Sequence, residues 1–92
     1  NPKSVAGVPT ISAATPTGAA AATLVTITGT GFTGVTGVAG VKFGAVNAAS
    51  YTVVSPTQIV ATVPAGSAGA ANIVVTHPTA GASAAFTYTR GA

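Results

Sequence analysis

The stretch VTITGTGF, residues 25–32, decides the fold. Its first four residues alternate apolar and polar side chains, with the period of two that marks a β-strand with one buried face. Gly29 and Gly31 then let the backbone leave the strand through conformations that a Cβ would forbid, which should return Phe32 as a plug at the end of a core. The stretch therefore predicts a strand that ends in a tight glycine joint.

The same alternation recurs in further segments on both sides of this joint. The residues that it places in the core are Val25, Ile27, Val41, Phe43, Tyr51, Val53, Ile59, Ala61, Val63, Ile73, Val75, Phe86 and Tyr88. The residues that it turns to solvent are Thr26, Thr28, Lys42, Thr52, Gln58, Thr62, Asn72, Thr76, Thr87 and Thr89. With an opening strand around Ile11, the chain should form about seven strands.

Glycine- and proline-rich connections separate these segments, because glycine supplies positive φ and proline lacks a backbone donor. The alanine run at residues 19–22 is too short to nucleate a helix and should be a loop. Short strands without intervening helices predict an all-β, immunoglobulin-like antiparallel β-sandwich with Greek-key connections. We expect one domain over residues 1–92, with 1–8 and 90–92 as linker ends. The expected connections are 16–18, 34–40, 44–47, 55–57, 64–69 and 78–81.

The chain contains no aspartate, glutamate or cysteine, which excludes most kinds of active site. General acid–base pairs, glycosidase carboxylates, Ser-His-Asp triads and calcium cages all need acidic side chains. A transition-metal site usually needs several ligands, and the chain has only His77, in an expected turn before Pro78. A phosphate-binding glycine loop needs a helix after it, and none is expected after Phe32. We therefore expect no catalytic, cofactor-binding or metal-binding residues, no cofactor, and no enzyme activity.

The charge of the chain disfavours nucleic acid as a partner. The formal net charge of +3 arises from missing acids, since the cations are only Lys3, Lys42 and Arg90 and they are not clustered. Lys42 should simply be solvated. No apolar run approaches the ~18 residues that cross a bilayer, so we expect no membrane insertion. Because the sequence begins with Asn1 and lacks methionine, we expect it to be part of a longer polypeptide.

Several stretches together resemble the IPT/TIG family of immunoglobulin-like domains. They are PTISAATPTG at 9–18, VTITGTGF at 25–32, KFG at 42–44, SPTQIVATVPAG at 55–66 and AFTY at 85–88. The resemblance spans nearly the whole chain. It implies an extracellular, non-catalytic structural or interaction module, on a bacterial cell-surface protein or on the head or tail of a phage virion. Its partners would be neighbouring domains or copies of the same assembly, or a host-surface protein or glycan.

The composition of the surface is consistent with such packing, because it is rich in threonine, serine and alanine and nearly free of charge. A high-GC codon bias would give the same composition without any functional meaning. A second hypothesis is a carbohydrate-binding accessory module of a polysaccharide-acting enzyme. It is weakened by the inward phase of Tyr51 and Tyr88 and by the absence of tryptophan. A ring exposed beside Asn72 or Gln58 would support it.

Two further hypotheses, DNA binding and ice binding, are disfavoured. The resemblance extends to transcription factors whose domain of this family contacts DNA, but this chain has few cations in its loops. An ice-binding surface needs an ordered array of threonines, and the spacing of the outward threonines is too irregular. The threonines in question are Thr26, Thr28, Thr62, Thr76 and Thr87.

Overall fold

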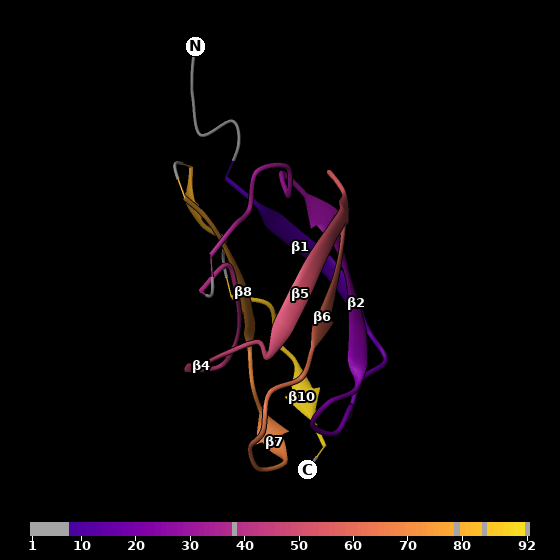
Figure 1. Cartoon of the computed structure of the whole chain (residues 1–92). Helices are drawn as coiled ribbons and strands as arrows, with labels where there is room; N and C mark the ends of the chain where they lie inside the picture. Colours follow the sequence, from indigo (N-terminus) through magenta and orange to yellow (C-terminus); the bar gives the residue numbers. More distant parts are fainter. Residues whose placement is uncertain (1–7, 38, 79, 84, 92) are drawn as a thin grey trace.

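The computed structural model describes residues 8–37, 39–78, 80–83 and 85–91, and its regular structure there consists of β-strands (Figure 1). One sheet has the strand order β1 (Thr10–Thr15), β2 (Leu24–Thr30), β6 (Gln58–Thr62) and β5 (Ser50–Ser55). The other has the order β4 (Val46–Asn47), β3 (Val41–Phe43), β8 (Ile73–His77) and β9 (Gly81–Ala82). A short ladder joins β10 (Thr89–Arg90) to β7 (Gly69–Ala70). The described residues include no helix long and apolar enough to cross a membrane.

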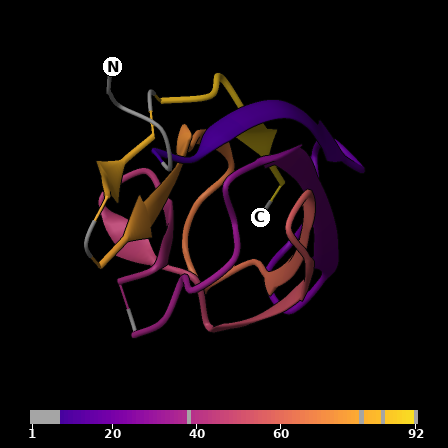
Figure 2. The ribbon, with the colours of Figure 1, turned by 90° about the horizontal axis from the view of Figure 1, so that it is seen from above.

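The order of the strands is that of an immunoglobulin-like sandwich. The first sheet corresponds to strands A, B, E and D of that fold, and the second to C′, C, F and G. The chain crosses between the sheets from β2 to β3, from β4 to β5 and from β6 to β8, and every strand pair is antiparallel. Seen from above, the two sheets lie on opposite sides of the domain (Figure 2). The predicted all-β, Greek-key antiparallel sandwich is therefore confirmed.

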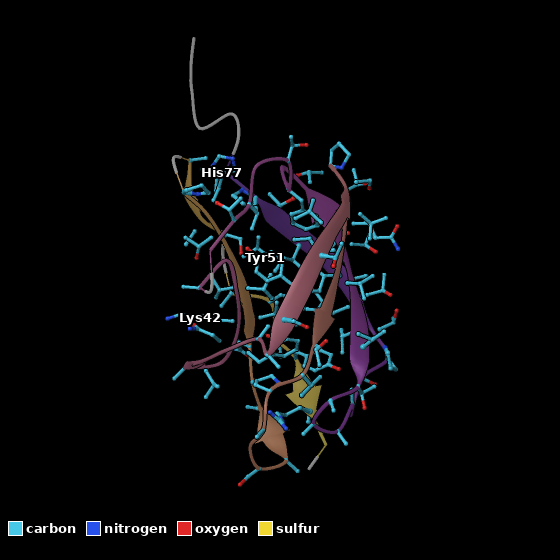
Figure 3. All side chains as sticks on the ribbon, viewed as in Figure 1. Lys42, Tyr51 and His77 are labelled. Carbon is cyan, nitrogen blue, oxygen red and sulfur yellow. The ribbon has the colours of Figure 1, made fainter. Side chains whose placement is uncertain are left out.

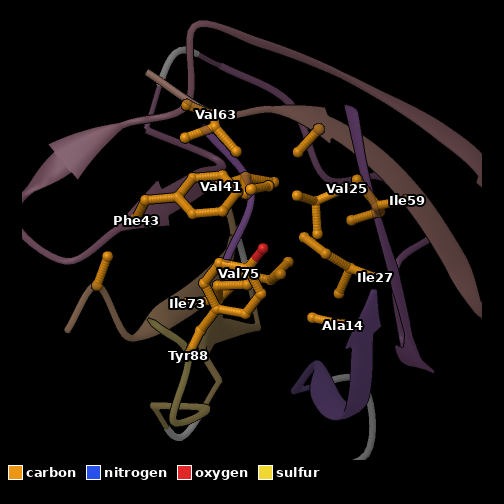
Figure 4. Close-up of a cluster of buried hydrophobic side chains, with 14 of the residues drawn as sticks. Ala14, Val25, Ile27, Val41, Phe43, Ile59, Val63, Ile73, Val75 and Tyr88 are labelled. Atoms are coloured by element: carbon orange, nitrogen blue, oxygen red, sulfur yellow. The ribbon is translucent and has the colours of Figure 1, made fainter. Parts of the chain in front are cut away.

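The core lies between the sheets and is formed by the inward residues of the central strands (Figure 4). Ile27 faces Ile59 across β2 and β6, and Val41 faces Val75 across β3 and β8; all four side chains are fully buried. The ring of Phe43 contacts that of Tyr88 edge to face, with 5.9 Å between centroids. The period-two prediction for these strands is thus confirmed, because each strand has one face on the core.

The glycine joint at the end of β2 is formed as predicted at Gly31 and Phe32, whereas Gly29 still pairs within the strand. A Cβ on Gly29 would lie 1.8 Å from the carbonyl oxygen of Thr10, so only glycine lets β1 approach this closely. Gly31 has a φ of 75°, in the region that favours glycine. Phe32 follows with its ring fully buried, and its amide donates to the carbonyl of Pro56 at 3.0 Å. The joint therefore closes one end of the core.

Several expected boundaries are wrong. The connection expected at 44–47 contains β4, because the chain turns back after β3 and pairs Asn47 with Lys42. The last alternating segment, from Phe86 to Thr89, does not form one strand: Phe86 forms a single bridge to Ile73, and β10 then pairs with β7 rather than with β8. β7 and β9 are two further short strands that begin inside the connections expected at 64–69 and 78–81, so the described residues contain ten strands instead of about seven.

Ser83 contributes to the division of the last strand. It is buried, its amide donates to the carbonyl of Val75 at 2.8 Å, and its hydroxyl accepts a hydrogen bond from the Val75 amide at 3.0 Å. A side-chain oxygen thus takes a place that a backbone carbonyl would hold in a continuous ladder. Phe86, expected in the core, is half-buried at this irregular edge.

Candidate interaction surfaces

The outer face of the first sheet carries hydroxyl, amide and apolar side chains, and its four strands contain no charged residue. One row across the sheet runs Thr15, Thr26, Val60 and Thr52, in the register of the paired strands. A second row runs Leu24, Thr62 and Ser50. We call this surface the threonine face and define it by Thr15, Leu24, Thr26, Thr28, Ser50, Thr52, Gln58, Val60 and Thr62.

The threonine face confirms the outward phase predicted for Thr26, Thr28 and Thr62. The other two threonines that an ice-binding array would need lie elsewhere. Thr76 is in β8 of the second sheet, and Thr87 is outside the strands. The five residues therefore do not form one array.

Tyr51 keeps its predicted inward phase and packs against the core, but it is only partly buried there. It lies on the edge strand β5, and its hydroxyl donates to the carbonyl of Gly37 at 2.8 Å (Figure 3). A Cβ on Gly40 would lie 2.2 Å from the Tyr51 hydroxyl, so the loop before β3 fits closely over the phenol. Burial raises the pKa of Tyr51 above the ordinary 10.0, which keeps the phenol neutral.

An open depression of about 370 Å³ lies beside this tyrosine. The residues that line it are Gly37, Ala48, Ala49, Ser50 and Tyr51. It offers one aromatic ring, one hydroxyl and backbone groups, which suit an uncharged polar ligand. Gln58 belongs to the threonine face, and Asn72 accepts the Tyr88 amide at 3.4 Å. The exposed part of the ring therefore lies beside Ser50, and not beside Gln58 or Asn72.

His77 ends β8 instead of lying in a turn, and it connects two loops. Its Nδ1 accepts the amide of Ala80 at 3.0 Å, so the ring proton belongs on Nε2, which donates to the carbonyl of Thr33 at 3.0 Å. A Cβ on Gly34 would lie 2.9 Å from Nε2. In the part of the chain that the structure describes, no three His, Cys, Asp or Glu residues gather at a metal site. The histidine therefore has a structural role.

The two described cations lie in different environments. Lys42 is half-exposed on the outer face of the second sheet and projects away from it (Figure 3). Arg90, which we expected in a linker end, lies in β10 and is only 5% exposed. Lys3 and residues 1–7 and 92 of the expected linker ends lie outside the described residues. Of the described residues, Lys42 alone thus presents an ordinary solvated cation, which is no basic patch for nucleic acid.

Comparisons with known proteins agree with this architecture. A family model described as "IPT/TIG domain" matches residues 9–89. Among solved structures, the chain is similar to the gamma-CGTase from Alkalophilic bacillus clarkii, with a TM-score of 0.79 and 25% sequence identity. The match covers 91% of this chain and 12% of that chain, so the likeness concerns a small part of the enzyme. No curated protein matches this chain.

Proposed function

The chain belongs to the IPT/TIG domain family, and from that premise we propose that it is a non-catalytic interaction module that packs against neighbouring domains or copies. The observation that carries this proposal is the threonine face, a sheet surface without a single charge. Charged groups oppose docking because removing their water costs much free energy. The hydroxyl and apolar side chains of this face cost less to desolvate. It is therefore suited to contact another protein surface.

Local pairing of the hydroxyl groups lowers the cost of docking further. Ser50 and Thr62 share a hydrogen bond of 3.0 Å across β5 and β6, so these groups keep a partner when water leaves. Leu24 in β2 is 61% exposed beside Thr62, and Val54 in the edge strand β5 is 56% exposed. Apolar groups of this size favour burial against a neighbour.

We further propose that the module stands outside the cell, on a bacterial surface protein or on a phage head or tail. The arrangement of the ends supports a role as a spacer: β1 begins near one end of the long axis and β10 lies near the other (Figure 1). The described domain is elongated, with principal extents of 44 × 20 × 19 Å. Consecutive domains joined at these ends would extend a chain rather than fold it back.

A charge placed on the threonine face tests the packing proposal. Thr52→Lys adds a cation to the face, and Thr76→Lys adds the same cation to the outer side of the second sheet as a matched control. Unfolding temperatures are measured for the 92-residue chain alone and within its parent polypeptide, and sedimentation velocity follows self-association. In the wild type, we expect either a higher unfolding temperature within the parent polypeptide than alone, or self-association. Thr52→Lys should abolish that effect, and Thr76→Lys should retain it. If neither exists in the wild-type protein, the proposal is wrong.

A second candidate, an accessory domain of a polysaccharide-acting enzyme, is favoured by the likeness to the gamma-CGTase. Its binding site would be the depression beside Tyr51, where a sugar ring could stack on the phenol and reach the Ser50 hydroxyl. Electrophoresis in gels that contain soluble starch would retard the wild-type chain and Tyr51→Phe, which keeps the ring, but not Tyr51→Ala. Equal mobility with and without starch would remove this candidate for that glycan.

A further inference from the structure

Arg90 is a buried cation in a domain that has no acidic side chain. Its side chain is 5% exposed, and a guanidinium stays charged at any physiological pH. Buried charges in proteins are normally paired with an opposite charge. The sequence contains no aspartate or glutamate, so no side chain of this chain can be that partner.

The guanidinium uses only part of its donor set within the domain. Nε donates to the carbonyl of Gly91 at 3.1 Å, and Nη2 donates to the carbonyl of Gly66 at 3.4 Å. Nη1 makes no hydrogen bond to any described residue. No side-chain nitrogen among those residues is both fully buried and without a partner, so Nη1 must reach the surface. One edge of the planar group is thus left for an acceptor from outside.

Gly66 keeps this edge accessible. A Cβ on Gly66 would lie 3.1 Å from Nη1 and 3.5 Å from Cζ of Arg90, and a larger side chain would crowd the guanidinium. The site lies where β10 meets β7, at the end of the sandwich from which the chain leaves (Figure 1). A neighbouring domain at this end would come directly against it.

We infer that the outward edge of Arg90 binds a carboxylate from an aspartate or glutamate of a neighbouring domain, since a copy of this chain has neither residue. The fork of N–H groups matches the two oxygens of a carboxylate, and an acid would neutralise a charge that this chain cannot. A phosphate has similar oxygens, but phosphate-rich partners need clustered cations, and the described residues show no such cluster around Arg90. The inference rests on the proposed role among neighbours, but it does not depend on the threonine face.

The single arginine of the chain makes the test direct, because its Nε–Hε signal in a ¹⁵N NMR spectrum needs no further assignment. The 92-residue chain, extended by a short Gly-Ser tail so that its terminal carboxylate does not compete, is titrated with sodium acetate. Sodium sulfate and sodium chloride are added in parallel at equal ionic strength. We expect saturable shifts of the Arg90 Nε–Hε and Gly66 amide signals with acetate but not with chloride.

Three variants sharpen the result. Lys42→Gln removes a cation elsewhere and should keep the acetate response, whereas Arg90→Lys should weaken acetate binding by at least about tenfold, because an ammonium lacks the planar fork. If Arg90→Lys does not fold, Gly66→Ala provides the comparison, since its Cβ crowds Nη1 and should also weaken binding. Shifts that are equal in acetate and chloride would overturn the inference, and sulfate binding tighter than acetate would overturn the choice of a carboxylate. Neither result would affect the outcome of the Thr52→Lys test.

Discussion

Replacing Gly29 by alanine should destabilise the domain by about 2–4 kcal/mol. The new Cβ would lie 1.8 Å from the Thr10 carbonyl oxygen, and contacts under 3.0 Å are essentially never seen, so the atoms must separate by at least 1.2 Å. The obstacle is backbone, with the Phe32 ring close behind at 2.8 Å, so a side-chain rotation cannot relieve it. Overpacking with a backbone shift costs about 1–3 kcal/mol. Losing the 2.6 Å hydroxyl pair between Thr10 and Thr30 adds about 1 kcal/mol.

Urea denaturation followed by circular dichroism measures this loss, and Gly18→Ala is the control. Gly18 has a φ of 69° but no atom within 4 Å of its ideal Cβ, so alanine there brings backbone strain of about 1–2 kcal/mol without a collision. For a domain of this size, Gly29→Ala should lower the melting temperature by about 10–25 °C. A Gly29→Ala variant that is no less stable than Gly18→Ala would refute the steric account of the joint.

Three further substitutions test the contacts of the loops and of the last strand. Tyr51→Phe removes the hydrogen bond to Gly37 and should cost about 0.5–1.5 kcal/mol near neutral pH. Because burial raises the pKa of Tyr51, the stability that its neutral phenol contributes is complete below pH 10 and is lost as the pH rises through the raised pKa. In urea titrations at alkaline pH, the free energy of unfolding should therefore fall less steeply with pH for Tyr51→Phe than for wild type. His77→Ala removes both ring hydrogen bonds and should speed hydrogen exchange in the turn after β8, while unchanged exchange there would contradict the tie between the two loops. Ser83→Ala should cost about 1–3 kcal/mol in thermal unfolding, because it leaves the buried Val75 amide without that acceptor, and a loss below about 0.5 kcal/mol would argue against it.

The sequence predicts the long strands well because burial of one face imposes a period of two. Ile27, Ile59 and Val75 are fully buried, as their alternation with polar residues requires. Phe32 is also placed correctly, since the glycine before it can adopt the positive φ that turns the chain back onto the core. Such local patterns identify the sandwich before any tertiary contact is known.

Short and edge elements could not be predicted in the same way. β4 has two residues, too few for any alternation, and it exists only because Asn47 pairs with Lys42. Tyr51 has an inward phase and packs against the core, but it lies on an edge strand, where its ring is covered only in part. Pairing and edge position are properties of the assembled sheets.

The two candidate sites depend on contacts between segments far apart in the chain. The depression beside Tyr51 needs Gly37 from the loop before β3, and no motif in the sequence marks that approach. Arg90 is near the end of the sequence, where a cation is normally solvated, and it is buried because β10 pairs with β7 and Gly66 offers it a carbonyl. The sequence indicates only that a buried arginine here would lack a counter-ion, because it contains no aspartate or glutamate.

The placement of β1 and β10 at opposite ends of the sandwich determines how the domain would bear mechanical load. A pull on both ends would slide β1 past β2, and the paired residues from Thr10 to Thr15 would resist in shear, all at once. At the other end, β10 is held by two residue pairs to β7, and two backbone hydrogen bonds join Thr89 to Gly18 and Gly91 to Ala19. Under tension, this shorter attachment should break before the longer β1–β2 ladder, while the first sheet and the core that it covers stay closed.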